Sequence, residues 1–202
     1  MKLYTSPGAC SLADHIALEW TGAPYEAQIV SRDERKQPWY TQLNPAGAVP
    51  VLTEGDWVLT QNAAILNYIA DKFPQANLGG DGTPEGRAEV NRWLGLLNAD
   101  MHPAFHPLFG SAAALGADAE AKAKEGAKQK LRGYFERVDA QLAGRDWLAG
   151  SRSIADPYLF VVTQWAKKLG IDLAGLSNLD AFDKRMADDA GVQAAMKAEG
   201  LI

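Results

Sequence analysis

Residues 2–18 read KLYTSPGACSLADHIAL, and this stretch sets the interpretation of the first half of the chain. Residues 2–5 are typical of a short strand, and the Ser-Pro-Gly turn at 6–8 ends it. From residue 11 the apolar side chains follow helical spacing, until Gly22 ends the run. The single cysteine of the chain, Cys10, therefore lies in the turn between a strand and a helix.

The strand and helix that this stretch predicts are followed by further short elements. Residues 25–30 (YEAQIV) indicate a second strand, which a strand-helix-strand order makes parallel to the first. Residues 31–42 are polar and suggest an irregular loop with a short helix, and residues 49–60 (VPVLTEGDWVLT) predict a hairpin. A helix over residues 62–73 ends at Pro74. We therefore expect a small α/β domain with a mixed sheet.

The second half of the chain contains helical patterns and no convincing strand. The Gly-rich stretch NLGGDGTPEG at residues 77–86 is the best linker. Apolar spacing after it predicts helices over residues 84–109, 119–143, 154–169, 178–189 and 192–199. The predicted division is an α/β domain at 1–77, a linker at 78–84 and an all-α domain at 85–202.

Composition excludes several classes of protein. The 202 residues carry a net charge of −5 with 47% hydrophobic and 22% charged side chains, which is ordinary for a globular chain and unsuited to binding nucleic acid. One cysteine cannot form an internal disulfide, and no Cys/His cluster suggests zinc. The sequence shows no charged-then-apolar leader and no apolar stretch that could span a membrane. We expect a cytoplasmic protein without membrane or nucleic-acid partners.

Cys10 has two interpretations. A helix N-terminus presents free N–H groups and a partial positive charge, and both stabilise a reactive thiolate. A free cysteine is equally well explained as a small buried apolar residue. Ser11, next to it, is a second candidate for a catalytic hydrogen-bond donor, and its alternative role is that of a helix N-cap.

Two further segments have features of a ligand site. At Val49-Pro50 a cis peptide bond would turn the backbone groups of Val49 outward, where an extended peptide could pair with them; an ordinary trans proline is the alternative. Gln61 and Asn62 stand at a predicted helix start, where amides and free N–H groups suit a small carboxylate; helix capping by Asn62 is the alternative. Since such edges lie together in open α/β sheets, a small acidic thiol peptide would suit Cys10 and both segments.

These segments, taken together, resemble one protein family. KLYTSPGACSLADHIAL is similar to the bacterial beta class of glutathione transferases, NPAGAVPVL at residues 44–52 to that family's cis-proline segment, and SIADPYLF at 153–160 to its capping box. The resemblance covers nearly the whole chain. It implies a thioredoxin-like domain with a mixed four-stranded sheet, an all-α helical bundle domain, and a homodimer in the cytoplasm.

The resemblance also implies roles for the residues of the first domain. Cys10 would lie beside the glutathione sulfur and could form a mixed disulfide with it, and Val49 would pair its backbone with glutathione, with Pro50 cis. Gln61 and Asn62 would hold the γ-glutamyl end. The beta class more often has Glu-Gly or Glu-Ser at these two positions, so the binding of the γ-glutamyl amine is in question.

Four basic residues complete the predicted site. Either Arg35 or Lys36 would bind the glycine carboxylate of glutathione, although a solvated charge run is the alternative for most of RDERK. By the resemblance, His102 faces Cys10 across the cleft between the domains, and His106, one helical turn further, could point the same way. No third ligand accompanies the two histidines, so we expect no metal site.

The resulting prediction is a glutathione transferase. Glutathione would be the co-substrate, and the partner a small hydrophobic electrophile bound in an apolar pocket lined by the helix over residues 85–109. Conjugation and Cys10-dependent thiol–disulfide exchange, with thiol transferase or peroxidase side activity, both remain open at this point. The alternative function is a non-catalytic protein that binds glutathione or hydrophobic ligands.

Overall fold

The computed structural model describes all residues from Met1 to Ile202. Its sheet has four strands in the order β2-β1-β3-β4. β1 (Lys2–Thr5) runs parallel to β2 (Glu26–Ile29) and antiparallel to β3 (Val51–Glu54), which forms a hairpin with β4 (Trp57–Thr60). The predicted mixed sheet is confirmed.

Alternation along the strands directs side chains to two different clusters. Leu3 and Leu52, which are opposite each other in the register of β1 and β3, belong to the large core. Val51, next along the chain, belongs to a small cluster with Val30 and Tyr40. The large core lies against α1 (Leu12–Thr21) and α3 (Asn62–Lys72), and the small cluster under α2 (Pro38–Leu43), which follows the short η1 (Glu34–Lys36).

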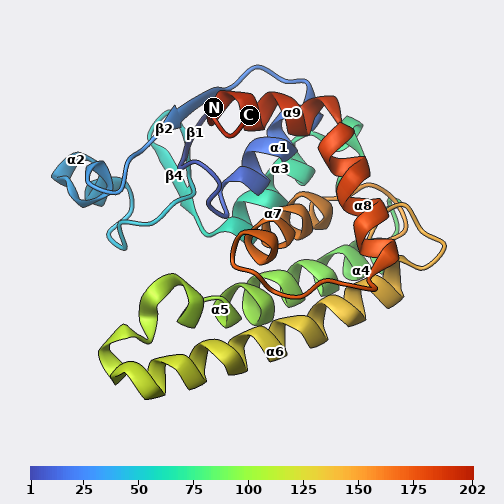
Figure 1. Cartoon of the computed structure of the whole chain (residues 1–202). Helices are drawn as coiled ribbons and strands as arrows, with labels where there is room; N and C mark the ends of the chain where they lie inside the picture. The colour runs from blue at the N-terminus through green and yellow to red at the C-terminus, as the bar shows by residue number, and fades with distance from the viewer.

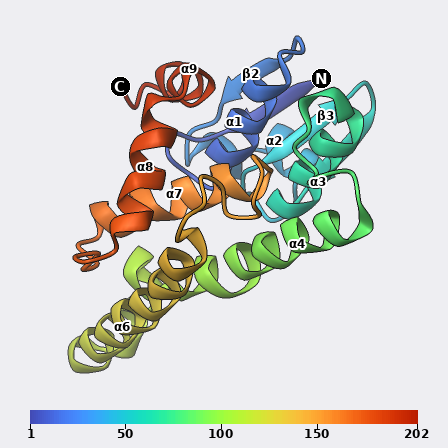
Figure 2. The same cartoon turned by 90° about the vertical axis from the view of Figure 1, so that its right-hand side faces the viewer.

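The second half of the chain is helical, as predicted (Figures 1 and 2). After η2 (Pro74–Ala76), its elements are α4 (Pro84–Gly95), η3 (Leu96–Met101), α5 (His102–Ala104), η4 (Pro107–Ser111), η5 (Ala113–Leu115), α6 (Ala117–Leu142), α7 (Ala155–Lys168), α8 (Ser177–Asp188) and α9 (Ala190–Ala198). None of these helices combines the length and the apolar character that crossing a membrane requires.

The prediction of one continuous helix over residues 84–109 is wrong. The regular α-helix ends at Gly95, and the wider π-helical turns of η3 and η4 flank the single short turn of α5. Pro103 and Pro107 explain the interruption, because proline has no N–H to donate to the carbonyl four residues earlier. The irregular segment carries both candidate histidines, His102 and His106.

The two halves share one hydrophobic core. Its 40 buried residues come from β1, from α1 and α3, and from every long helix of the second half. α7 contacts α1, α4 and α8, and α9 returns to pack along α1. Because the two halves share this core, the predicted domain limits, 1–77 and 85–202, stay a prediction. α4 begins at Pro84, the last residue of the predicted linker.

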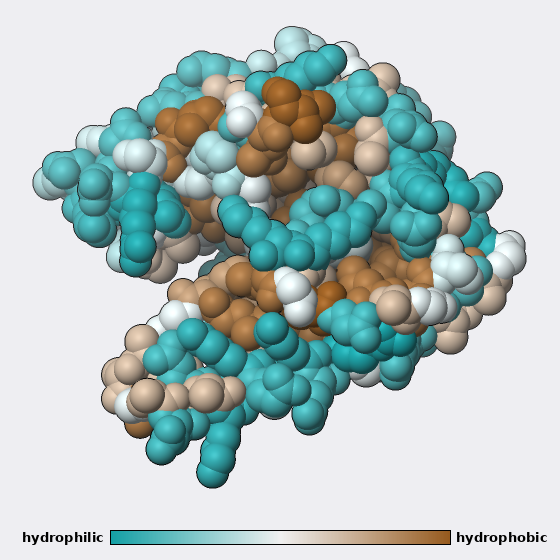
Figure 3. Space-filling view, viewed as in Figure 1, coloured by the Kyte–Doolittle hydropathy of each residue, from teal (hydrophilic) through white to brown (hydrophobic).

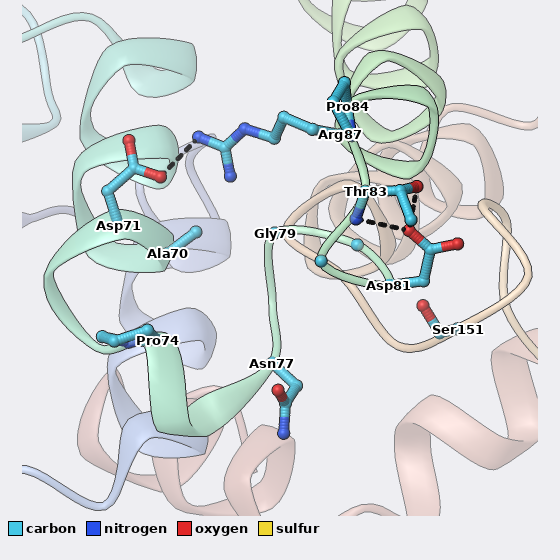
Figure 4. A pocket seen from close by; sticks show the side chains of 12 residues that line it. Ala70, Asp71, Pro74, Asn77, Gly79, Asp81, Thr83, Pro84, Arg87 and Ser151 are labelled. Atoms are coloured by element: carbon cyan, nitrogen blue, oxygen red, sulfur yellow. Dashed lines mark hydrogen bonds and ion pairs between the residues drawn. The ribbon is translucent and has the colours of Figure 1, made fainter.

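The linker is a structured loop (Figure 4). The Arg87 guanidinium on α4 reaches across it to α3, where it pairs with Asp71 Oδ1 at 2.9 Å and donates to Asn67 Oδ1 at 2.7 Å. Gly80 has φ of 110°, and a Cβ there would lie 2.8 Å from the Gly86 carbonyl carbon, so only glycine fits. The loop borders an open polar hollow of 680 Å³ that contains none of the predicted site residues.

The predicted pairing of Ser153 with Asp156 before α7 is confirmed. The buried Asp156 carboxylate accepts from Ser153 N at 2.7 Å, from Ser153 Oγ at 3.1 Å and from Leu148 N at 2.9 Å. Burial nevertheless raises the pKa of Asp156 to about 6. The interaction fixes the start of the most buried helix of the chain.

We expect Asp156→Ala to lower the free energy of unfolding by about 2–4 kcal/mol, because it leaves buried N–H and O–H donors without acceptors. Urea unfolding followed by circular dichroism measures this change. Asp188→Ala, at the exposed end of α8, serves as the control and should change stability by less than about 0.5 kcal/mol. Equal effects of the two substitutions would show that the Asp156 hydrogen bonds contribute nothing specific.

Candidate functional site

The loop between β1 and α1, which carries Cys10, is fixed from both sides by the second half of the chain. The buried Glu199 carboxylate, directly after α9, accepts from Thr5 Oγ1 at 2.7 Å and from Gly8 N at 3.0 Å, and it pairs with His15 Nδ1 at 3.0 Å. Trp165 Nε1 on α7 donates to the Gly8 carbonyl at 2.7 Å. The position of Cys10 therefore depends on α7 and α9.

Cys10 lies where two adjoining cavities meet. Its Sγ is 3.6 Å from the Val49 carbonyl oxygen, and its own carbonyl accepts from Asn62 Nδ2 at 2.8 Å. One cavity, of 280 Å³, is lined by Cys10, Asn44, Ala46, Ala48, Val49, Pro50, Gln61, Asn62, Asn98, His102, Pro103, His106 and Tyr158. The other, of 450 Å³, is lined by Ser6, Pro7, Gly8, Ala9, Cys10, Arg35, Ala48, Val49, His102, Phe109 and Trp165.

These cavities open on the side where the molecule is hollowed between the α2 segment and the arm that α5 and α6 form (Figure 3). Hydrophobic surface lines the inner edge of this arm in the same view.

Of the two interpretations of Cys10, the reactive thiolate is opposed by burial and stays a prediction. Burial, followed by the negative charge of Asp14, raises the pKa of the Cys10 thiol to about 12. Asn62 and backbone N–H groups lower it by less. The first turn is tight, and its Leu12 and Ala13 N–H groups donate to the carbonyls of Ala9 and Cys10 instead of to the sulfur. These contributions favour the thiol form of Cys10 at neutral pH.

Ser11 does not line either cavity. Its side chain is fully buried, and its Oγ lies 2.8 Å from Thr5 Oγ1 and accepts from Ser6 N at 3.2 Å. It also makes no side-chain capping bond to α1. Ser11 connects β1 to the loop, and nothing in this arrangement brings it to a ligand.

The segment that precedes β3 is available to a peptide. The Val49–Pro50 bond is cis, as the resemblance implied. The Val49 N–H donates to no group of the chain, and its carbonyl accepts only the long bond from Cys10 Sγ. Val49 and Pro50 both line the first cavity. Val49 therefore offers its N–H as a donor and its carbonyl as an acceptor to an extended ligand.

Gln61 and Asn62 line the first cavity at the start of α3. Gln61 has φ of 74°, an uncommon conformation for a residue other than glycine. Asn62 is buried, and although its Nδ2 donates to the Cys10 carbonyl, its Oδ1 has no hydrogen-bond partner. An unpaired buried acceptor is costly, so a ligand with an N–H donor would satisfy it.

The structure distinguishes between the two basic candidates. Arg35 lines the second cavity, and its buried Nε has no partner. Lys36 lines neither cavity, has a 67% exposed side chain and pairs with Asp33 at 2.8 Å. Arg35 is therefore the cation that a carboxylate in the site would meet.

Both predicted histidines line the first cavity, with ring centroids 5.8 Å apart. His102 Nδ1 lies 2.7 Å from Tyr158 Oη, and this hydroxyl lies 3.3 Å from Asn98 Oδ1. Burial, with a smaller effect of His106, lowers the pKa of His102 to about 4. His102 is therefore neutral at physiological pH and takes part through hydrogen bonds. No three His, Cys, Asp or Glu side chains of the chain gather closely enough to hold a metal ion.

Sequence reasoning missed three residues of the site. Helical spacing alone places Tyr158 and Trp165 on the apolar face of the helix predicted over 154–169, and no sequence pattern singles out Asn98. Both aromatic side chains are largely buried, but each places its polar atom at the site. A hydroxyl or indole N–H in an otherwise apolar helix is the signal that identifies such positions, because buried Tyr and Trp usually have a hydrogen-bond partner.

A more apolar cavity of 540 Å³ adjoins the second one and shares Pro7, Gly8, Phe109 and Trp165 with it. Its remaining lining residues are Leu12, Val161, Gln164, Lys167, Lys168, Leu169, Met196 and Leu201. Of the helix over residues 85–109, which is predicted to line the substrate pocket, only Phe109 lines this cavity, whereas Asn98, His102, Pro103 and His106 line the first one. Most of the wall comes from α7, α9 and the C-terminal residues.

Comparison with known sequences identifies both halves. Residues 1–71 match the family described as "Glutathione S-transferase, N-terminal domain", and residues 97–189 match "Glutathione S-transferase, C-terminal domain". The chain is 60% identical to glutathione S-transferase GST-4.5 of Xanthomonas campestris pv. campestris, with 100% of both chains covered.

Solved structures agree with this match. A glutathione S-transferase from Xylella fastidiosa has a TM-score of 0.96 at 52% identity, over 100% of this chain and 99% of that one. A bacterial beta-class enzyme from Sphingomonas chungbukensis gives 0.88 at 41%, and a sphingomonad glutathione S-transferase in complex with glutathione gives 0.87 at 39%, each over 100% of both chains. The chain belongs to the glutathione S-transferase family and is similar to its bacterial beta class.

Proposed function

We propose that this glutathione S-transferase conjugates glutathione to small apolar electrophiles, with the glutathione sulfur as the nucleophile. The proposal is carried by one observation: the cavities beside Cys10 contain buried polar atoms that no group of the chain satisfies. These atoms are the donor Nε of Arg35 and the acceptor Oδ1 of Asn62.

Glutathione has the chemistry that would satisfy both atoms. Its glycine carboxylate would accept from Arg35, and the amine of its γ-glutamyl end would donate to Asn62. The free N–H and the carbonyl of Val49 lie between these two positions in the lining and would pair with the peptide's backbone. The solved complex of the sphingomonad relative with glutathione supports this choice of ligand.

The glutathione sulfur would be placed near Cys10, at the junction of the cavities. The Cys10 S–H group, which remains protonated because of its raised pKa, would donate a hydrogen bond to the glutathione thiolate. His102, neutral and oriented by Tyr158, would contribute a hydrogen bond from the opposite wall. In the reaction, a carbon–sulfur bond forms between glutathione and the electrophile, and the leaving group departs with the bonding electrons.

The adjoining apolar cavity would hold the electrophile. It shares Phe109 and Trp165, whose ring centroids lie 5.2 Å apart, with the second cavity. Aromatic walls of this kind bind apolar compounds without requiring a particular functional group. The identity of the electrophile is accordingly set by size and shape.

Thiol–disulfide exchange at Cys10 is the second candidate, because Cys10 lies in both cavities. The Cys10 thiolate would attack one sulfur of oxidised glutathione, forming a mixed disulfide and releasing the other half as glutathione thiolate. The raised pKa of Cys10 opposes this step at neutral pH. A protein that only binds these ligands would show affinity for glutathione without turnover.

The family also suggests the location of the protein and its oligomeric state. We propose a cytoplasmic homodimer. The exposed Trp57 and Val58 on the edge strand β4 are apolar surface that a second copy would cover.

We expect Arg35→Met to weaken glutathione binding about tenfold in calorimetry, since it removes a charge-assisted hydrogen bond to the glycine carboxylate. Lys36→Met is the matched control. It removes the same charge one residue away and should change the dissociation constant less than about twofold. A larger effect of Lys36→Met would reverse the assignment of the two residues.

We expect Cys10→Ala to retain conjugation of an aryl halide, with kcat/KM lower by no more than about tenfold, because the cysteine supplies only one weak hydrogen bond. Steady-state kinetics at saturating glutathione measure this. Intact mass after incubation of the native protein with oxidised glutathione should show little adduct at pH 7. Complete loss of turnover in Cys10→Ala, with rapid formation of the adduct, would favour thiol–disulfide exchange instead.

A further inference from the structure

The apolar cavity beside Phe109 and Trp165 is not uniformly apolar. Seven of its lining residues are hydrophobic, and the charged or amide side chains among the rest are Gln164, Lys167 and Lys168, from the last turns of α7. No aspartate or glutamate lines it, although the chain as a whole has 25 acidic and 20 basic residues. The charge on this wall is therefore opposite in sign to that of the molecule.

Two of the three polar side chains are already engaged. The buried carboxylate of Asp183, on α8, accepts from Gln164 Nε2 at 2.6 Å through one oxygen and pairs with Lys167 Nζ through the other. These contacts join α7 to α8 and balance the charge of Lys167. They leave Lys168 as the cation of the wall that has no assigned partner.

Lys168 is exposed, and no carboxylate of the chain, the C-terminal one included, lies within ion-pair distance of it. Glu199, which lies between the lining residues Met196 and Leu201 in the sequence, does not face it. Its carboxylate is bound by groups of β1, of the following loop and of α1. An unbalanced ammonium group beside an apolar wall is complementary to an apolar compound with a negative charge. A solvated lysine at the negative end of a helix is the alternative.

The spacing along α7 says where such a charge would lie. Trp165 lines both the apolar cavity and the cavity beside Cys10, whereas Lys168 lines only the apolar one. The two residues are three positions apart, so their side chains leave the same side of the helix about 4.5 Å apart along its axis. An aromatic ring on Trp165 would thus have its reactive carbon toward the glutathione sulfur and its opposite end toward Lys168.

We propose that the second substrate is an aromatic electrophile that carries a carboxylate or sulfonate opposite its reactive carbon, and that Lys168 is the residue that selects it. The inference rests on the proposed function, which assigns this cavity to the electrophile. The aromatic walls set size and shape, and Lys168 adds a preference for negative charge. With an aryl chloride, the glutathione sulfur bonds to the ring carbon, chloride leaves with the bonding electrons, and the thiol proton goes to solvent. The acidic group is unchanged.

A matched pair of substrates tests the preference. Both 4-chloro-3,5-dinitrobenzoate and 4-chloro-3,5-dinitrobenzamide have the substituent opposite the reactive carbon, and only the first is an anion. The measured quantity is the ratio of their kcat/KM values, benzoate to benzamide. Comparison of this ratio between native protein and Lys168→Gln cancels the intrinsic reactivity of the two compounds. We expect the ratio to fall about fivefold in Lys168→Gln, mainly through a higher KM for the benzoate, which is the upper range for an exposed ion pair. Salt at about 0.5 M should lower the native ratio in the same direction.

A second lysine serves as the control for net charge. Lys122, on α6, is exposed, has no ion pair and lines none of the three cavities, so Lys122→Gln should leave the ratio unchanged. Equal losses with both substrates in Lys168→Gln would show that the side chain only supports packing. An unchanged ratio would show a solvated lysine, and either result overturns the proposal.

Binding without glutathione separates this proposal from the proposed function. Calorimetry with the unreactive pair 2-naphthoate and 2-naphthamide should show the same loss of preference for the acid in Lys168→Gln. Native protein that binds the amide as tightly as the acid, with no effect of the substitution on their ratio, would mark the cavity as a site for neutral compounds and overturn the proposal. A clear preference for the acid in a protein that turns over neither chloride would refute conjugation and leave the role of Lys168 in binding intact.

Discussion

The hydrogen bonds of one buried carboxylate, that of Glu199, hold the site together. This group lies at the end of the chain, yet its partners Thr5, Gly8 and His15 lie at the beginning. An ionised carboxylate can be enclosed only when donors surround it, so the last helix and the first loop must take up their positions together. Trp165 completes the arrangement by binding the other side of Gly8. Cys10 follows Gly8 by two residues, so the contacts of Thr5, Gly8 and His15 fix its position.

The same constraint explains why the two halves form one core. α9 belongs to the helical half by sequence but packs along α1 of the sheet half, and α7 also contacts α1. Substitutions far from the ligand cavities, at the contact of α9 with α1, would therefore act on the site through the position of the loop. The contacts of Arg87, on α4, with Asp71 and Asn67, on α3, add a second connection between the halves.

Local sequence patterns were sufficient for much of this architecture. The strand-helix-strand order and the hairpin required a mixed sheet, and Ser153 and Asp156 at their spacing required the cap of α7. Patterns failed where the answer depends on tertiary contacts. Apolar spacing continued through Pro103 and Pro107, although neither proline can donate the hydrogen bond that a regular helix needs. The sequence RDERK does not distinguish Arg35 from Lys36, because the two side chains differ only in their surroundings in the folded chain. Arg35 lines a cavity, whereas Lys36 is exposed.

Long-range contacts were the least accessible to sequence reasoning. Glu199 and its partners are separated by 184 to 194 positions, so no local pattern joins them. The effect on Cys10 has the same origin. The turn before α1 leaves two interpretations of Cys10 open, a reactive thiolate and a small buried residue. Burial, which raises the pKa of the thiol, depends on the folded chain and is not visible in the local pattern.

Two thiols would meet in the occupied site, and their surroundings differ. Burial first, and Asp14 in smaller measure, raise the pKa of the Cys10 thiol. The glutathione sulfur would instead lie toward the cavity, with the Cys10 S–H, the neutral His102 and the more distant Arg35 guanidinium around it. Hydrogen bonds from neutral donors favour a thiolate without the cost of burying another unpaired charge. Under the proposed function, these hydrogen bonds would favour ionisation of the ligand's sulfur, while burial opposes ionisation of Cys10.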